Sequence, residues 1–272
     1  MLKKQQIILL FIGLFCTTLS GQNETIDSLS DTIHFKQIRS DTLFESNQII
    51  SLLSLRNGSN VYETKFDHSP TNLRPTSDFG RNNQAIAAIN GSFYDMDKGG
   101  SVTYFEISDT VISKSKSVKN KWGKPNNLIN GAIIIDVNNK ITIEFAKAEQ
   151  VYEASKKEAA VLVTGPMLLL NSALTEMPDS KFVKNRHPRT CLCTTSEDII
   201  LITIDGRQKN AAGMNLYEVQ QFLKSINCIN AVNLDGGGST TMWMKGKGVV
   251  NSPSDKSGER SVSNVLLILK RD

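Results

Sequence analysis

Residues 231–241 read AVNLDGGGSTT, a short apolar run that ends in a carboxylate and continues into three glycines and three hydroxyl residues. Glycine lets the backbone take positive φ and lets a ligand come close to main-chain N–H groups. Successive N–H groups in such a turn can form an anion-binding nest. A tight turn between two strands would account for an Asp-Gly pair alone. The full run favours a site where Asp235 does chemistry beside a bound anion or sugar.

A strand, a helix and another strand lead into this turn. Residues 199–205 read IILITID and predict a strand that ends at Asp205. Asn215 and Glu218 form a capping-box pattern, and the helix they begin carries an apolar face of Leu216, Val219, Phe222, Leu223 and Ile226. Residues 229–234 predict a strand again. The order is that of a βαβ unit, with parallel strands and a right-handed crossover.

This arrangement brings two carboxylates to one edge of the sheet. Asp205 and Asp235 both follow the carboxyl ends of the predicted parallel strands, where ligands bind in open α/β sheets. If the strands pair directly, the two acids end strands ~4.8 Å apart and could divide acid and base roles. The glycine-rich turn is not a phosphate-binding P-loop, because no Gly-Lys-Ser/Thr follows.

A similar pattern occurs earlier, where residues 85–95 read AIAAINGSFYD. A buried strand would end at Asn90, whose amide could hydrogen-bond a sugar hydroxyl or a phosphate. Phe93 or Tyr94 could stack on a sugar ring. A hairpin turn with core aromatics explains the same letters, and the residues alone leave both interpretations open.

Residues 186–190, RHPRT, open another predicted strand. The planar fork of Arg189 suits an oxyanion such as phosphate, although an arginine at a strand start is more often a surface residue. His187 is one of only three histidines, and a lone histidine is more often structural than catalytic. The sequence has no histidine-rich metal set.

The amino terminus has the order of a secretory signal. Lys3 and Lys4 precede the apolar residues 7–15, and small or polar residues follow. The run is short for a membrane span, so we expect residues 1–21 to be removed and the protein to be secreted or periplasmic. Lipoprotein anchoring through Cys16 is the weaker alternative, because bulky Phe15 precedes it. Cleavage lowers the net charge from +4 to +2, since two lysines and no acids are lost.

Composition fits a soluble globular domain, with 39% hydrophobic and 21% charged residues in 272. The weak positive charge gives no case for nucleic acid. Three cysteines remain after cleavage, and Cys191 and Cys193 lie on one face of a strand and bridge poorly. Buried free thiols are therefore predicted for both and for Cys228.

The remaining segments complete the prediction of an α+β fold, a mixed β-sheet with a C-terminal βαβ unit and flanking helices in a single domain. Residues 22–84 supply strands and a loop, and residues 85–272 form the catalytic region. Within these, 22–40 are expected to be loosely ordered and 68–83 and 177–185 to be loops, with strands in 41–55, 101–112 and 131–145.

An ordered set of motifs resembles the phosphodiester glycosidase domain family, which includes the mannose 6-phosphate uncovering enzyme and bacterial relatives. The set consists of Asn90-Gly91-Ser92-Phe93, Gly165-Pro166, Arg189-Thr190, Asp205-Gly206-Arg207, Gly213-Met214, Asn233 to Thr240 and Glu259-Arg260. The resemblance implies a single α+β domain that hydrolyses a sugar-1-phosphodiester, releasing the sugar and leaving a phosphomonoester. Cys193 departs from the family, which commonly has glycine there.

We therefore expect Asp235, Asp205 and Arg189 to be catalytic. The expected substrate-binding residues are Asn90, Gly91, Phe93, His187, Thr190, Arg207, Gly236, Gly237, Gly238, Ser239, Thr240, Glu259 and Arg260. No cofactor is required, although a divalent cation on Asp235 is a candidate because carboxylates and phosphoryl oxygens suit hard cations. The partner would be a small molecule or glycan bearing a sugar-1-phosphodiester. The alternatives are a non-catalytic module that binds envelope or exopolysaccharide glycans, and a phosphodiesterase that cuts the P–O bond.

Overall fold

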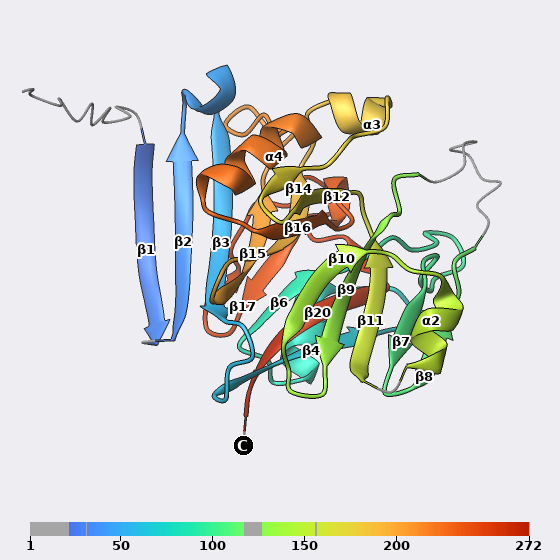
Figure 1. Cartoon of the computed structure of the whole chain (residues 1–272). Coiled ribbons are helices and arrows are strands. Elements are labelled where there is room, and N and C mark those ends of the chain that lie inside the picture. The colour runs from blue at the N-terminus through green and yellow to red at the C-terminus, as the bar shows by residue number, and fades with distance from the viewer. Residues whose placement is uncertain (1–21, 31, 117–126, 156, 272) are drawn as a thin grey trace, which may run out of the picture.

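The computed structural model describes residues 22–30, 32–116, 127–155 and 157–271, and strands dominate this part of the chain (Figure 1). The largest sheet has the order β1 (Gln22–Ser30), β2 (Ile33–Ser40), β3 (Gln48–Arg56), β15 (Asp198–Ile204), β14 (Arg189–Thr194), β16 (Asn230–Asn233), β12 (Met167–Leu170) and β13 (Ala173–Leu174). We call it the long sheet.

Two five-stranded sheets face it. The first has the order β10 (Ile141–Phe145), β9 (Gly131–Asp136), β11 (Glu158–Thr164), β7 (Phe105–Ile107) and β8 (Thr110–Ser113). The second has the order β18 (Gly248–Val249), β17 (Met242–Met244), β6 (Ala87–Asn90), β20 (Asn264–Lys270) and β4 (Tyr62–His68). A short pair, β19 (Ser261–Val262) and β5 (Arg74–Pro75), completes the strands that the described residues contain.

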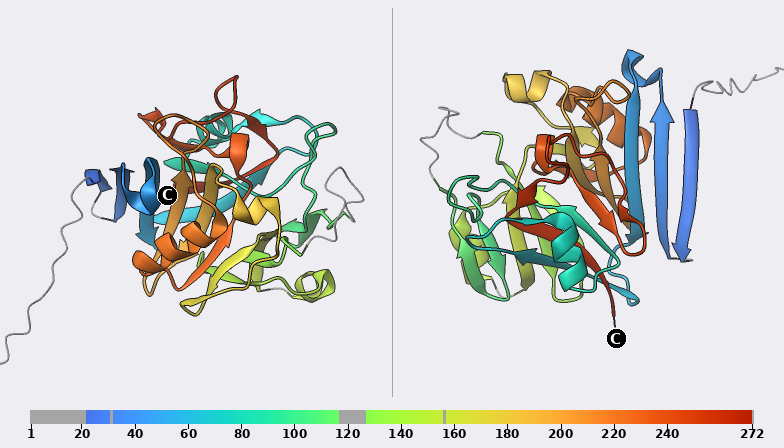
Figure 2. Two further views of the ribbon diagram at one scale, coloured as in Figure 1. Left: turned by 90° about the horizontal axis from the view of Figure 1, so that it is seen from above. Right: turned by 180° about the vertical axis from the view of Figure 1, so that it is seen from behind.

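The core lies where the three large sheets meet, and helices cover their outer faces. Leu201 of the long sheet, Ile133 of the first and Leu266 of the second belong to one buried cluster. Outside it, α4 (Leu216–Ser225) packs on the long sheet, α2 (Glu149–Ala154) on the first and α1 (Thr76–Asn82) on the second. Figure 2 shows α1 in front of the second sheet when the molecule is seen from behind. Both faces of the central strands are therefore buried, which explains their long apolar runs.

The two strands of the predicted βαβ unit are parallel, as expected, but they are not neighbours in the sheet. Every strand pairing in the described residues is antiparallel, so the predicted mixed sheet is wrong in that respect. β15 and β16 each pair with β14 on opposite sides, which makes them parallel to one another but not neighbours. The acids that follow them are thus separated by two strand spacings, roughly 10 Å.

Three segments predicted as loose are ordered elements. β2 alternates buried and exposed residues and pairs along its length with β3. Within 68–83, α1 buries Phe79 against the second sheet, and a Cβ at Gly80 would lie 2.3 Å from the Trp243 ring. Within 177–185, α3 (Lys181–Lys184) is capped by the Ser180 hydroxyl, which accepts a hydrogen bond from the Val183 N–H.

Other local predictions are confirmed. The capping box of Asn215 and Glu218 is present at the start of α4. Residues 131–145 form the hairpin of β9 and β10, and 101–112 contain two short strands, β7 and β8. Two 3-10 turns, η1 (Leu43–Glu45) and η2 (Gly237–Ser239), lie in loops.

The prediction of three free thiols is wrong for two of them. Cys193 and Cys228 form a disulfide, with Cα atoms 5.8 Å apart, whereas Cys191 is free and buried. Cys193 belongs to the buried cluster under α4. Cys228, which comes after that helix in the chain, belongs to the same cluster. Sequence spacing does not reveal this approach, because it depends on the return of the chain after α4.

The predicted signal sequence, residues 1–21, lies outside the described residues. Among the residues that are described, no helix is both long enough and apolar enough to span a bilayer.

Candidate active site

The glycine-rich turn leaves the long sheet at the end of β16 and forms η2. Gly237 has φ +64°, and a Cβ at Gly238 would lie 2.3 Å from the Arg260 guanidinium. A larger residue would be strained at Gly237 by its backbone conformation, and at Gly238 it would displace the Arg260 guanidinium. The predicted anion nest is largely occupied by internal bonds, because the Gly236 N–H donates to the Asp235 carboxylate and the Gly237 N–H to the Pro188 carbonyl. Within the described residues, the Gly238 N–H has no such partner.

Asp235 lies at the centre of this turn and is partly exposed. Its carboxylate accepts hydrogen bonds from the Gly236 N–H, at 3.0 Å, and from the Ser239 hydroxyl. Burial raises the pKa of Asp235 to about 6, against the lowering effects of Ser239, Arg260 and Gly236. A carboxyl with such a pKa exchanges its proton near neutral pH, which suits a general base or acid.

Arg260 supplies the nearest positive charge. Its Nε donates to Asp255 Oδ2 at 2.6 Å, and its guanidinium lies against the Gly238 backbone. Its field lowers the pKa values of Asp235 and Tyr94. Asp255 therefore fixes a cation beside the turn while part of the guanidinium stays accessible, with 30% of the side chain exposed.

Tyr94 reaches the same turn from the second sheet. Its hydroxyl donates to the Ser261 carbonyl at 2.9 Å and lies 3.4 Å from the Ser239 hydroxyl. Burial raises the pKa of Tyr94, so it is a neutral phenol at pH 7. The contribution of Tyr94 is thus a hydroxyl group next to Ser239, in addition to the ring that the sequence indicated.

A second arginine contacts the same turn. Arg207 is exposed, has φ +61°, and places its guanidinium against the Gly237 backbone. Its Nη2 is 3.3 Å from His187 Nδ1. Burial lowers the pKa of His187, with smaller effects from Arg189 and Arg207, so this imidazole is neutral at pH 7 and can accept from Arg207.

These groups converge, and we call them the Asp235 site: Tyr94, His187, Arg207, Asp235, Gly236, Gly237, Gly238, Ser239 and Arg260. Two arginines contact a turn of small residues that carries one carboxylate, and of the two Arg260 is the one that lowers the pKa of Asp235. The arrangement can hold an anion between the guanidinium groups while the carboxylate acts on a neighbouring atom.

Arg189 is not an open phosphate clamp. Its side chain is only 1% exposed, and the guanidinium donates to the carbonyls of Met214, Phe182 and Asn185. It also stacks on the Phe182 ring at 4.8 Å. Burial lowers the pKa of Arg189 to about 10, which leaves it charged at pH 7. Arg189 therefore anchors α3 and the Met214 loop to β14.

Asp205 makes no direct contact with the Asp235 carboxyl among the described interactions. Because β14 separates the two strands, neither carboxyl is among the groups that perturb the pKa of the other. Asp205 accepts from Asn251 Nδ2 and the Ser252 N–H, and burial raises its pKa to about 6. Its observed contacts hold the loop around Asn251 against the sheet edge.

Asn90 and its neighbours form the framework behind the site. The Asn90 side chain is fully buried, donates to the Asp235 carbonyl at 2.6 Å, and accepts from the Thr190 hydroxyl and the Thr241 N–H. Its carbonyl oxygen already accepts two hydrogen bonds, and the side chain has no exposed surface for a sugar to contact. The Gly91 carbonyl accepts from the Asp235 N–H, so the predicted ligand residues Asn90, Gly91 and Thr190 position the turn instead.

Three further predicted residues lie around this framework. The Glu259 carboxylate accepts from the Ser77 N–H at the start of α1, outside the site. Phe93 is half-buried and meets Phe182 edge to face, with ring centroids 6.4 Å apart. Thr240 is buried, and its hydroxyl oxygen has no hydrogen-bond partner among the described residues.

The sequence did not single out Asp255 or Asn251 for the site. Asp255 closes a turn with Gly258 and accepts from Arg260, five residues away. The pattern Asp-x-x-Gly before Arg260 is a turn signal that could have placed the acid near the arginine. Asn251 contacts Asp205 and Thr240 over longer sequence distances, and no local pattern announces that contact.

The residues around Asp235 do not match a divalent-cation site. Within the described residues, no three His, Cys, Asp or Glu side chains gather in a geometry that could hold a metal. The groups that affect the pKa of Asp235 are a guanidinium, a hydroxyl and an N–H, and of these only the hydroxyl could add an oxygen ligand for Mg²⁺ or Ca²⁺.

A family model described as phosphodiester glycosidase matches residues 83–269. The chain belongs to the phosphodiester glycosidase family. The match contains all the residues of the Asp235 site, and it confirms the resemblance on which the predicted enzyme class rested.

Individual relatives agree with this assignment. The chain is 27% identical over 202 residues to human N-acetylglucosamine-1-phosphodiester alpha-N-acetylglucosaminidase, covering 66% of this chain and 37% of the human protein. It is 38% identical over 96 residues to the mouse protein of the same name, covering 33% of this chain and 18% of that one. The chain thus spans well under half the length of these curated relatives.

A solved structure supports the fold. The catalytic domain of the zebrafish protein of that name superposes with a TM-score of 0.68 at 21% identity, covering 92% of this chain and 89% of the zebrafish chain. This likeness extends over the N-terminal strands as well as the region that the family model matches.

Proposed function

We propose that this chain hydrolyses sugar-1-phosphodiesters at the glycosidic C–O bond, releasing the sugar and leaving a phosphomonoester. One observation carries the proposal: the Asp235 carboxyl lies in a turn where Arg260 contacts Gly238 and lowers the pKa of the carboxyl, and where Arg207 contacts the neighbouring Gly237. A carboxylate on a turn that two cations contact suits a substrate with an electrophilic carbon next to a phosphate.

Asp235 acts on the anomeric carbon in this proposal, either as a nucleophile or as the base that activates water. Both roles need the ionised carboxylate, and its pKa of about 6 makes that form predominant at pH 7. The negative charge also stabilises the oxocarbenium character that develops as the C–O bond breaks.

The departing phosphate is stabilised by charge and needs no proton. A phosphomonoester is already a good leaving group, so neutralising its charge matters more than general-acid help. Arg207, Arg260 and the Gly238 N–H are the groups placed for this. A second carboxylate is therefore unnecessary, and the position of Asp205 outside the site is compatible with the reaction.

We further propose that the enzyme is exported after removal of residues 1–21 and that residues 85–272 form its catalytic region. The charged, apolar and small-residue order of the amino terminus supports export. The names of the mammalian relatives make N-acetylglucosamine the first sugar to test, with an envelope or exopolysaccharide glycan as the candidate source.

The test is a turnover screen of sugar-1-phosphodiesters, beginning with N-acetylglucosamine 1-phosphate esters, on the mature protein. Turnover in ¹⁸O-enriched water should place the label on the anomeric oxygen of the free sugar at short times. Label in the phosphate would show P–O cleavage and overturn the role of Asp235. Saturable glycan binding without turnover of any ester would favour a binding module instead.

A further inference from the structure

The surroundings of Asp235 contain several groups that bind negative charge but no second carboxyl in contact with it. The Asp235 carboxylate accepts from the Gly236 N–H and the Ser239 hydroxyl, and every other group that affects its pKa is either its own burial or Arg260. Departure of a phosphomonoester needs no proton donor. Attack of a water molecule on the anomeric carbon does need a base, because the water must lose a proton. The base that the site offers therefore decides what can receive the sugar.

The two other titratable groups of the Asp235 site that are not arginines offer no such base. Arg207 Nη2 lies 3.3 Å from His187 Nδ1. A guanidinium can only donate, so Nδ1 accepts and the single proton of the neutral imidazole is on Nε2. The one lone pair of the His187 ring is thus directed to Arg207. Tyr94 is a neutral phenol that donates to the Ser261 carbonyl at 2.9 Å.

The carboxylates closest in sequence to Arg260 have other partners. Asp255 Oδ2 accepts from Arg260 Nε at 2.6 Å, and this hydrogen bond holds the pKa of Asp255 below its ordinary value. A carboxylate with a lowered pKa is a weak base. The Glu259 carboxylate accepts from the Ser77 N–H at the start of α1. Neither group is free to take a proton from water.

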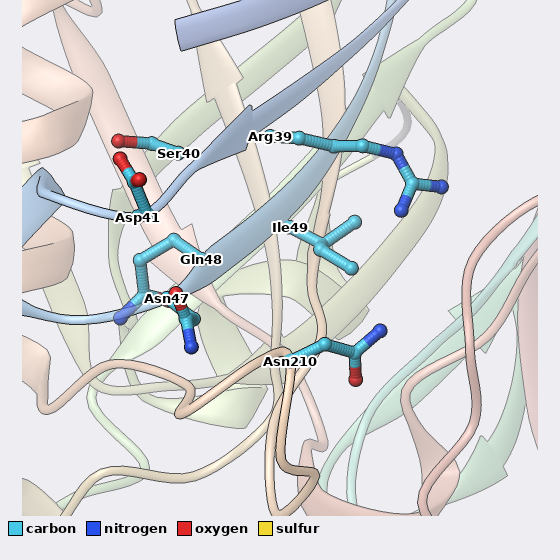
Figure 3. Close-up of a pocket in the computed structure, with 7 residues that line it drawn as sticks. All are labelled: Arg39, Ser40, Asp41, Asn47, Gln48, Ile49 and Asn210. Atoms are coloured by element: carbon cyan, nitrogen blue, oxygen red, sulfur yellow. The ribbon is translucent and has the colours of Figure 1, made fainter. Parts of the chain in front are cut away.

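Two further carboxylates lie near the loop of residues 206–213. Asp205 precedes this loop, and its Oδ1 accepts from the Asn251 side-chain amide and from a backbone N–H. Asp41 lines a cavity together with Asn210 of the loop. Figure 3 shows the Asp41 carboxylate beside Ser40 on the left of this cavity, whereas the Asn210 side chain is turned to the right. Neither carboxylate contacts Asp235 among the described interactions.

The groups proposed to hold the departing phosphate stay in place after it leaves. Arg207 is exposed, and the ion pairs of the described residues include none to it. The Arg260 side chain is 30% exposed beside Gly238, whose N–H has no backbone partner there. A phosphomonoester dianion is already a nucleophile and needs no base. It can therefore bind where the first phosphate left and attack the same carbon.

We infer that the chain also transfers the sugar from one phosphomonoester to another, in addition to hydrolysing the phosphodiester. The inference rests on the proposed function and gives Asp235 the role of nucleophile. Covalent catalysis of this kind divides one displacement into two, and the second displacement accepts any nucleophile that the site binds. Phosphate is the nucleophile for which the site has fixed charges.

Neither step of the transfer moves a proton. In the first, an Asp235 oxygen forms a bond to the anomeric carbon, the bond from that carbon to the phosphate oxygen breaks, and the electron pair leaves with the phosphomonoester dianion. In the second, an oxygen of the incoming dianion bonds to the anomeric carbon, and the ester bond to Asp235 breaks, which restores the carboxylate. Two displacements keep the anomeric configuration of the donor. Water attacks the same ester in parallel and gives the free sugar and a proton.

The experiment supplies ethyl phosphate as acceptor to the mature protein. The donor is the α-sugar 1-(methyl phosphate) that the turnover screen finds to be cleaved fastest, with N-acetylglucosamine first. ³¹P spectra and mass spectrometry distinguish the ethyl phosphodiester, formed only by transfer, and the free sugar is measured separately as the product of hydrolysis. Ethanol at the same concentration is the control for an acceptor without charge.

We expect an ethyl phosphodiester in the α configuration and no ethyl glycoside from ethanol. Two charge-assisted contacts should favour the phosphate over water, mole for mole, by about a thousandfold. Water is in roughly thousandfold excess over about 50 mM acceptor, so that transfer and hydrolysis should be comparable at this concentration.

Arg207→Gln tests the route through the phosphate-binding groups. The ratio of transfer to hydrolysis should fall about tenfold, on the scale of one charged hydrogen bond, because attack by water does not use the Arg207 charge. This ratio does not depend on how much of the variant is folded. Arg56→Gln is the matched control and should leave the ratio unchanged, since exposed Arg56 pairs with Glu197 at the end of β3 away from Asp205.

The outcomes separate the transfer from the proposed function. Free sugar without any ethyl phosphodiester would overturn the transfer and leave the hydrolysis standing. A β-configured ethyl phosphodiester would show a single displacement and would overturn the nucleophile role of Asp235. An unchanged ratio in Arg207→Gln would overturn the phosphate route. If no ester of the screen gives either product, the proposed hydrolysis is wrong and the transfer with it.

Discussion

The pH dependence of turnover gives a direct test of the role of Asp235. If the ionised carboxylate is the active form, kcat/KM for an N-acetylglucosamine 1-phosphate ester follows the ionised fraction. With a pKa of about 6, that fraction is about 90% at pH 7 and about 10% at pH 5. We therefore expect an acidic limb with a midpoint near pH 6 and a loss of about tenfold between pH 7 and pH 5.

The perturbation that assigns this limb is Arg260→Gln. Arg260 lowers the pKa of Asp235, so removing its charge should raise that pKa. The midpoint of the limb then moves to higher pH, whatever the loss in absolute rate. Steady-state assays from pH 4.5 to 8.5, at constant ionic strength, measure this shift.

Asp205 provides the control, because burial raises its pKa to about 6 as well. Asp205→Asn should keep the limb where it is, since Asp205 lies outside the Asp235 site. If the acidic limb disappears in Asp205→Asn, the limb reports the ionisation of Asp205 and not that of Asp235. A midpoint that stays fixed in Arg260→Gln, or a rate that rises toward acid pH, would refute the base or nucleophile role of Asp235.

Three further predictions follow from other contacts. Asp235→Asn should abolish turnover while the thermal midpoint changes little, and a collapse of that midpoint in calorimetry would favour a purely structural turn. Arg189→Met should lower the free energy of unfolding in urea by roughly 3 kcal/mol or more, because it leaves carbonyls of three residues without a donor; an intact stability with lost activity would restore the phosphate-clamp interpretation. Replacing Cys193 and Cys228 together by alanine should cost about 4 kcal/mol, the loop-closure value for a separation of 35 residues, and equal stability to wild type in urea would contradict it.

The sequence predicted elements whose signals are local. The capping box at Asn215, the hairpin turn in residues 131–145 and the strand ends at Asn90 and Asp235 depend on neighbours a few residues apart. The structure shows all of them. α1 and α3 were missed because helices of seven and four residues are too short to show an apolar period. Their stability comes from tertiary packing, such as that of Gly80 on Trp243.

The site could be predicted only in part, for a related reason. Asp235, the glycines and Arg260 were found because they lie within short motifs. Arg189 and Asp205 have the same local appearance as ligand-binding residues, and only the structure shows which groups they contact. Arg189 donates to carbonyls up to 25 residues away, and Asp205 accepts from residues 46 and 47 positions later. No single-sequence pattern encodes which strand lies between β15 and β16.

Asn90 links the long sheet and the second five-stranded sheet where they meet behind Asp235. Its one amide bonds to the Asp235 carbonyl, to Thr190 of the long sheet and to Thr241 just before β17 of the second sheet. The position of the Asp235 carboxylate therefore depends on the contact between the two sheets and not on either sheet alone. If the two sheets separate slightly on heating, Asp235 would lose its alignment before either sheet unfolds. Enzyme activity is therefore sensitive to the contact between the two sheets, and inactivation on heating should precede loss of the β-sheet signal in circular dichroism.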